Sequence, residues 1–243
     1  MNAKMTILSG AFARISKLSI ALLLGSAWIA SAQNPQLETK NGRQFATVVF
    51  SQALWNASPP YYSIAIDSTG NATYQSTPQS MEKTGVPYTT EFLASAAVRD
   101  SVFRLVQELN FLKLSSKDMQ DLPAVESIDT LVFREGQTVN EITYHSSHNL
   151  RIQRLTSLFQ SIAATLDFGR QLALMHQHGN AGVAAKLREM QEMAEQGRLR
   201  EVQVVSPILN EIASDSTLDR VSRQRATSIL SDAQHLSAES ASQ

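Results

Sequence analysis

The chain beyond residue 44 begins with short apolar runs, and in those at residues 61–66 and 72–76 hydrophobic and polar residues alternate, a pattern typical of β-strands. Residues 45–50, 61–66 and 72–76 are rich in β-branched and aromatic side chains. The second and third runs flank Asp67-Ser-Thr-Gly70 and predict a β-hairpin, while Pro59 and Pro60 separate the first run from it. Residues 86–93 are expected to be extended.

The hydrophobic spacing changes to that of a helix from Ala96 to Leu112, where apolar residues recur every three or four positions. Residues 128–133 and 138–144 then predict a second hairpin across Glu135-Gly136. Beyond His148 the pattern is helical almost throughout. We expect helices over residues 150–179, 183–197 and 199–212 and from 218 onward, with Ser206 as an N-cap before Pro207.

This order predicts an α+β fold, in which an antiparallel sheet is covered on one face by the helix 96–112 and is followed by a C-terminal α-helical segment. We predict an α+β domain at residues 45–167, a helical domain at 168–238 and a disordered tail at 239–243.

The first 32 residues have the pattern of a secretory signal peptide. Lys4, Arg14 and Lys17 precede an apolar run over residues 18–30, and Ala30-Ser31-Ala32 offers a cleavage point before Gln33. Residues 33–44 are expected to be a flexible leader. The apolar run is shorter than the ~20 residues of a spanning helix, so a membrane anchor through an uncleaved signal is the less favoured alternative. We expect a bacterial protein that is periplasmic or secreted.

Composition excludes several classes of protein. The chain is 43% hydrophobic and 18% charged, which is typical of globular proteins, and it has no cysteine for a disulfide, a thiolate metal site or a cysteine nucleophile. Lys and Arg number 21 against 22 Asp and Glu, and three of the basic residues lie in the predicted signal. The remainder is mildly acidic, so we expect no nucleic-acid partner.

Two short motifs resemble catalytic loops. Asp67-Ser-Thr-Gly70 is similar to the Asp-Thr-Gly loop of aspartic proteases, but it has one residue too many and no second copy. We interpret it as a turn in which Asp67 caps its own backbone and Gly70 takes a positive φ. Asp167-Phe-Gly169 lacks the other kinase motifs and is interpreted as a coincidence.

Four histidines form two close pairs, His145 with His148 and His176 with His178, which in principle could supply four metal ligands. On a helix the second pair would point about 200° apart. The favoured interpretation is a helix C-terminal charge for His176 and His178 and a polar loop residue for His148. We therefore predict no metal site and no cofactor.

Between residues 45 and 167 the chain has the strand from Tyr62 to Ile66 with Gly70 and Tyr74, Asn110-Phe111 at the end of the helix, Asp121-Leu122-Pro123, and residues 142–144. With these residues the order of elements resembles that of one of the bacterial secreted domain families of unknown function. The resemblance implies an extracytoplasmic α+β domain and brings no catalytic residues.

No recognisable nucleophile, metal or cofactor motif is present, so we assign no catalytic, cofactor-binding or metal-binding residue. We expect a non-catalytic envelope protein that binds a protein partner, or itself, through its C-terminal helices. The alternative is a hydrolase acting on an envelope substrate, with carboxylates such as Asp118 and Asp121 that meet only in the fold. Whether the protein is an enzyme stays open at this point.

Overall fold

A computed structural model of the chain describes residues 45–55, 57, 59–77, 87–113 and 127–241, with side chains as far as residue 232. The predicted signal, the leader and the loop that contains Asp118 and Asp121 lie outside these residues. None of the described helices is both long and apolar enough to cross a membrane.

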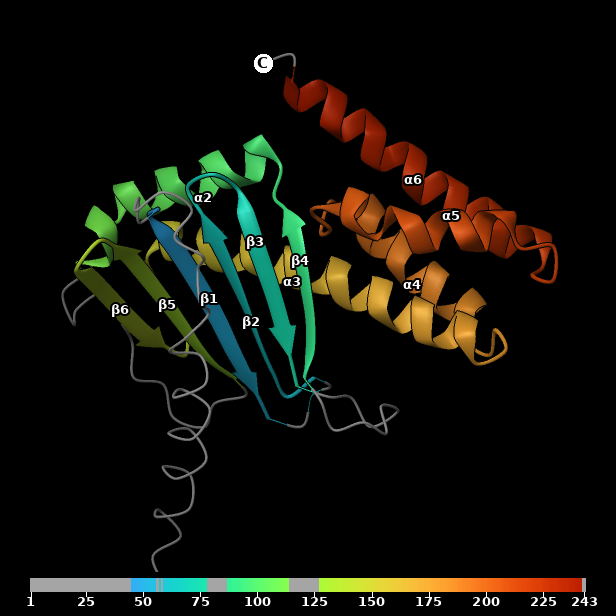
Figure 1. The fold of residues 1–243 in the computed structure, drawn as a ribbon, viewed down its shortest axis with the longest axis horizontal. Helices are drawn as coiled ribbons and strands as arrows, with labels where there is room; N and C mark the ends of the chain where they lie inside the picture. The colour runs from blue at the N-terminus through green and yellow to red at the C-terminus, as the bar shows by residue number, and fades with distance from the viewer. Residues whose placement is uncertain (1–44, 56, 58, 78–86, 114–126, 242–243) are drawn as a thin grey trace, which may run out of the picture. The chain divides into compact units, whose positions relative to one another are not determined.

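Six strands form one antiparallel sheet in the order β4-β3-β2-β1-β5-β6 (Figure 1). The strands are β1 (Thr47–Leu54), β2 (Tyr61–Asp67), β3 (Asn71–Ser76), β4 (Tyr88–Leu93), β5 (Ser127–Glu135) and β6 (Thr138–Tyr144). Both predicted hairpins are confirmed. β1 lies in the interior of the sheet, because it pairs with β2 on one side and with β5 on the other.

The helices are α2 (Ala96–Glu108), α3 (Leu150–Gln177), α4 (Val183–Glu195), α5 (Ser206–Ser214) and α6 (Arg220–Ala241). Two short 3-10 segments, η2 (Asn110–Leu112) and η4 (Val202–Val205), precede β5 and α5. The predicted fold class, an α+β fold with a C-terminal helical segment, is confirmed.

The core lies between one face of the sheet and the helices α2 and α3. Strand alternation puts Val48, Phe50 and Ile64 on that face, all fully buried. The rings of Phe50 and Phe159 stack with centroids 5.3 Å apart, which fixes α3 against the middle of the sheet. The sequence predicted one covering helix, and α3 is a second.

Helix α2 ends earlier than predicted. Its last residue is Glu108, and Asn110, Phe111 and Leu112 all have positive φ values, between 50° and 62°. The Phe111 carbonyl accepts a hydrogen bond of 2.8 Å from Asn140 Nδ2, and Leu112 is buried. This contact with β6 holds a turn of a kind that non-glycine residues rarely adopt.

The start of two C-terminal helices also differs from the prediction. Ser206 is the first residue of α5 and not its N-cap, and its hydroxyl donates to the Gln203 carbonyl. The preceding η4 already turns the chain, so α5 needs no side-chain cap. Helix α6 begins at Arg220, where Asp219 accepts hydrogen bonds from the Ser222 backbone and hydroxyl, and its backbone continues beyond the predicted end at residue 238.

Helix α3 passes through the predicted domain boundary between residues 167 and 168. It runs behind the sheet in Figure 1 and continues past β4 to meet the C-terminal helices. A Cβ atom at Gly169 would lie 2.3 Å from Val205 Cγ1, so glycine permits α3 and η4 to approach this closely. One continuous helix therefore belongs to both predicted parts.

Candidate functional site

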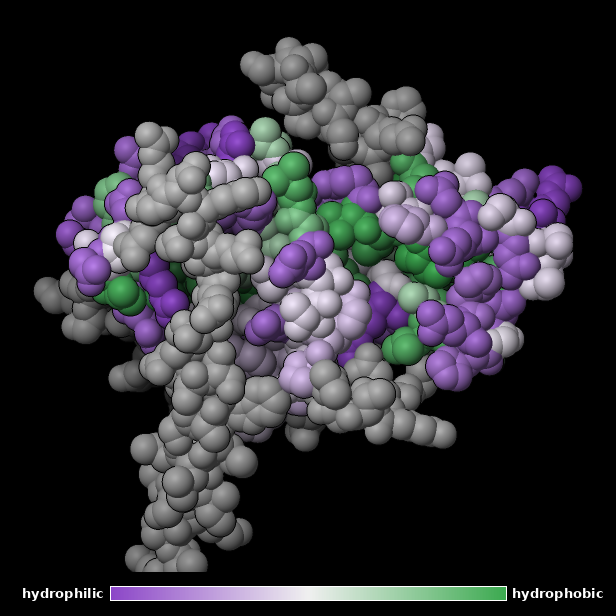
Figure 2. Space-filling view, in the orientation of Figure 1, coloured by the Kyte–Doolittle hydropathy of each residue, from purple (hydrophilic) through white to green (hydrophobic). Residues whose placement is uncertain are grey.

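A groove of about 320 Å³ lies between the edge strand β4, the C-terminal half of α3 and the segment η4–α5. Most of its lining is apolar, and one lining residue is charged. The lining residues are Tyr88, Thr90, Leu166, Gly169, Arg170, Ala173, Leu174, Gln177, Val204, Val205, Pro207 and Ile208. Figure 2 shows hydrophobic surface gathered between the sheet and the C-terminal helices on this face. A mostly apolar concavity with few polar groups is the usual form of a ligand site.

The walls of the groove follow from local sequence. Alternation in β4 turns Tyr88 and Thr90 toward α3, while Thr89 and Glu91 are exposed on the opposite face of the sheet. The close contact at Gly169 brings η4 and α5 alongside α3, so the wall formed by η4 and α5 lies close to the walls formed by β4 and α3.

The buried side chain of Arg170 contributes to the lining of this groove. Its Nη1 donates to the Ser76 hydroxyl at 2.5 Å, and its Cζ lies 4.8 Å from the centroid of the Tyr88 ring. Arg170 is only 4% exposed, so these contacts fix its position. Burial, and next the charge of Asp167, raise the pKa of the neighbouring Tyr74 phenol well above its usual range. The cluster places a guanidinium group beside hydroxyl groups, and Tyr74 stays protonated.

A second hollow of about 670 Å³ lies on the surface of α4. Lys186, Arg188, Glu189 and Glu192 contribute to its lining, and the Lys186 ammonium pairs with Glu189 at 2.6 Å. It has the character of a solvated charged face, so we regard the first groove as the better candidate. Met190, by contrast, is fully buried and belongs to the hydrophobic core.

The Asp67 loop is a turn, as interpreted from the sequence. Asp67 Oδ1 accepts hydrogen bonds from the backbone N–H of Thr69 at 2.8 Å and of Asn71 at 3.0 Å. Gly70 has φ +97°, and a Cβ there would also press on the Ala94 carbonyl. The Asp167-Phe-Gly169 motif lies within α3, where the glycine serves helix packing.

The structure does not bring the two histidine pairs together into a metal site. His145 Nδ1 is 3.1 Å from the Ser127 carbonyl, and His148 is an exposed loop residue. Among the described residues, no three His, Asp or Glu side chains are placed to hold a metal ion.

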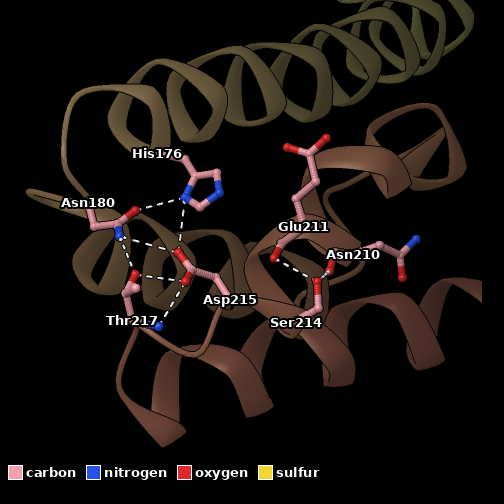
Figure 3. A network of polar contacts seen from close by, with 7 residues as sticks. All are labelled: His176, Asn180, Asn210, Glu211, Ser214, Asp215 and Thr217. Atoms are coloured by element: carbon pink, nitrogen blue, oxygen red, sulfur yellow. Dashed lines mark hydrogen bonds and ion pairs between the residues drawn. The ribbon is translucent and has the colours of Figure 1, made fainter.

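His176 instead joins a polar cluster at the end of α3 (Figure 3). Its Nδ1 donates to Asn180 Oδ1 at 2.8 Å and lies 3.7 Å from Asp215 Oδ2, while Asn180 also bonds Thr217. Hydrogen bonds from Thr217 lower the pKa of the Asp215 carboxyl. His178 turns to the Leu174 carbonyl at 2.7 Å. The cluster connects α3 to the segment before α6. Nearby Ser214 is not part of this connection, because its hydroxyl donates to the Asn210 carbonyl within α5.

A buried polar chain on the sheet was not predicted. The Tyr62 hydroxyl donates to Gln52 Oε1 at 2.8 Å, and Gln52 Nε2 donates to Asp129 Oδ1 at 2.7 Å. Burial raises the pKa of the Asp129 carboxyl, although the Gln52 hydrogen bond and the charge of His145 oppose the shift. The three residues face one another only through the β1–β2 and β1–β5 registers. The β1–β5 register joins segments that lie far apart in the chain, so no local sequence pattern predicts it.

The predicted carboxylates Asp118 and Asp121 lie outside the described residues, so the hydrolase alternative stays a prediction. No model of a protein family matches the chain, and no curated protein matches it.

Proposed function

We propose that the protein is an exported, non-catalytic binding protein of the bacterial envelope that holds an apolar ligand or partner segment in the groove between β4, α3 and α5. The observation that carries the proposal is the lining of this groove, which is mostly apolar and includes the buried side chain of Arg170. Water at such walls is displaced favourably by apolar surface. α3 and α5 form much of the groove, so the proposal keeps the expected role of the C-terminal helices.

Binding is tested with 1-anilinonaphthalene-8-sulfonate, an apolar anionic dye, added to the purified chain without residues 1–32. Saturable fluorescence enhancement is expected. Ala173→Trp fills the groove from α3 and should abolish saturable binding without lowering the melting temperature by more than a few degrees. The matched control is Ala185→Trp in the exposed hollow on α4, which should bind the dye like the parent. Equal binding by both variants, or no saturable binding by the parent, contradicts the proposal.

Export is a separate part of the proposal and rests on the basic start, the apolar run and Ala30-Ser31-Ala32. Residues 1–32 fused to a reporter enzyme that is active only outside the cytoplasm should confer activity. Leu23→Arg in the apolar run should abolish it, whereas Leu8→Arg outside the run should not. An N-terminus at or near Gln33 in the mature protein is expected by mass spectrometry, and a cytoplasmic product that retains residues 1–32 would contradict export.

A further inference from the structure

We infer that the occupant of the groove is an extended polypeptide segment of another protein, which adds to the sheet as a strand along β4. This inference rests on the proposed function, because it names the chemical class of ligand for the same groove. The groove lies beside the edge strand β4, whose outer backbone groups can pair with another strand, and its other walls are mostly apolar. An extended peptide can satisfy both features.

The backbone of β4 presents hydrogen-bonding groups on its outer side. The Ala94 N–H donates to the Gly70 carbonyl, on the β3 side. In an antiparallel ladder the direction alternates along the strand, so Tyr88, Thr90 and Phe92 also turn their backbone groups to β3. The N–H and C=O groups of Thr89, Glu91 and Leu93 therefore point away from the sheet. No backbone hydrogen bond links them to another described residue.

The sequence of β4 does little to block pairing at this edge. Natural edge strands are protected by lysine, proline, bulges or short length. Between Tyr88 and Leu93 the strand has one charged residue, Glu91, and no lysine or proline, and it pairs with β3 over its whole length. Leu93 is moreover 68% exposed. An added strand would satisfy the outer backbone groups.

Strand alternation in the ligand fits the groove. Every second side chain of an added strand would face the same side as Tyr88 and Thr90, where Ala173, Leu174 and Ile208 present apolar walls. The side chains between them would lie beside the exposed residues Thr89 and Glu91 on the other face of the sheet. The expected ligand has hydrophobic residues at alternate positions.

The surroundings of β4 favour a single segment over the sheet edge of a second copy. The contact of Ser95 with Glu201 closes the space just beyond Leu93, where the Ser95 hydroxyl donates to Glu201 Oε1 at 2.7 Å. Residues of η4 and α5 line the groove beside β4, and a single strand needs less room next to them than the edge of a second whole sheet.

The test is a selection of short random peptides displayed on phage against the chain without residues 1–32, followed by fluorescence anisotropy with the selected peptides. Glu91→Pro removes one outward N–H and no bond to β3, a change that edge strands tolerate. Glu91→Ala is the matched control, since it removes the same side chain and keeps the N–H. Peptide binding should be roughly tenfold weaker for Glu91→Pro and unchanged for Glu91→Ala. Replacing the amide of the peptide by an ester at the facing position should weaken binding similarly.

The outcomes separate this inference from the proposed function. If Ala173→Trp abolishes peptide binding but Glu91→Pro matches Glu91→Ala, the groove binds apolar ligands and strand addition is wrong. If no selected peptide loses binding in Ala173→Trp, the inference is overturned even where the dye binds the groove. A concentration-dependent dimer that Glu91→Pro dissociates, seen by light scattering, would show that a second copy is the occupant and would also overturn it.

Discussion

The carboxylate of Glu201 caps the first turn of α2 by accepting hydrogen bonds from both the backbone N–H and the hydroxyl of Ser95, 106 positions earlier in the chain. Ser95 in turn accepts from the Val98 N–H, so the pair satisfies two donors at the start of the helix. Glu201 is 5% exposed and has φ 61°. The contact ties the segment before α5 to the helix that covers the sheet.

Glu201→Gln should destabilise the protein by about 1–3 kcal/mol, because the amide has one acceptor oxygen and would turn its NH2 group toward the Ser95 donors. The free energy of unfolding is measured by urea denaturation followed by circular dichroism. Glu211→Gln, an exposed position on α5, is the control and should change little. Equal stability of the two variants would show that the buried contact contributes nothing.

Leu105→Asp should unfold the chain, since Leu105 is buried on the inner side of α2 and an isolated charge there costs several kcal/mol. Gln107→Asp places the same charge on the exposed side of the same helix and should fold normally. Thermal melting distinguishes them. If both variants melt like the parent, α2 does not form part of the core.

Gly169→Ala should lower the free energy of unfolding by about 1–3 kcal/mol even though alanine favours helix, because its Cβ would overlap the buried Val205 side chain. Val205→Ala removes the side-chain atoms that the new Cβ would meet, and by itself it also lowers the free energy of unfolding. In the double variant the loss should be smaller than the sum of the two single losses. Strict additivity would mean that the two residues do not touch.

Asp129→Asn should change the pH dependence of stability. Burial raises the pKa of the Asp129 carboxyl, so the folded chain holds this proton more tightly than the unfolded chain. This tighter proton binding stabilises the folded chain fully when the pH is below the ordinary aspartate pKa of about 3.9. The stabilisation is lost as the pH rises through the folded-state pKa of Asp129. Asparagine keeps an acceptor for Gln52 and stays neutral. The melting temperature of Asp129→Asn relative to the parent should therefore increase as the pH rises above the ordinary aspartate pKa of about 3.9. A difference that does not change with pH would contradict the raised pKa of this buried carboxyl.

Local patterns predicted the elements of this fold well. The strand alternation around Gly70 and Gly136 and the apolar stripe from Val98 to Leu109 depend on neighbours within a few residues, so the sequence contains the whole signal. The helix end at Glu108 was missed because a contact with Asn140, on β6, holds the left-handed turn. Ser206 was misjudged as a cap because η4 takes over that role.

The groove could not be predicted, because its walls come from segments far apart in the chain. Nothing in the sequence of α3 alone shows that Arg170 meets Ser76 or that Gly169 faces Val205. A glycine within an otherwise helical pattern is a signal of close packing that can be recognised in advance. What packs against it depends on the tertiary fold.

The place of β1 inside the sheet has a consequence for how the chain folds. β1 meets β2 soon after it is made, but its other neighbour, β5, lies across α2, and the register pairs Thr47 with Arg134. Until the β5–β6 hairpin docks, Thr47–Leu54 presents an open, uncharged edge with high β-propensity, which is typical of segments that aggregate. Formation of this distant pairing, more than the final stability, should therefore set the speed of folding and the yield of soluble protein.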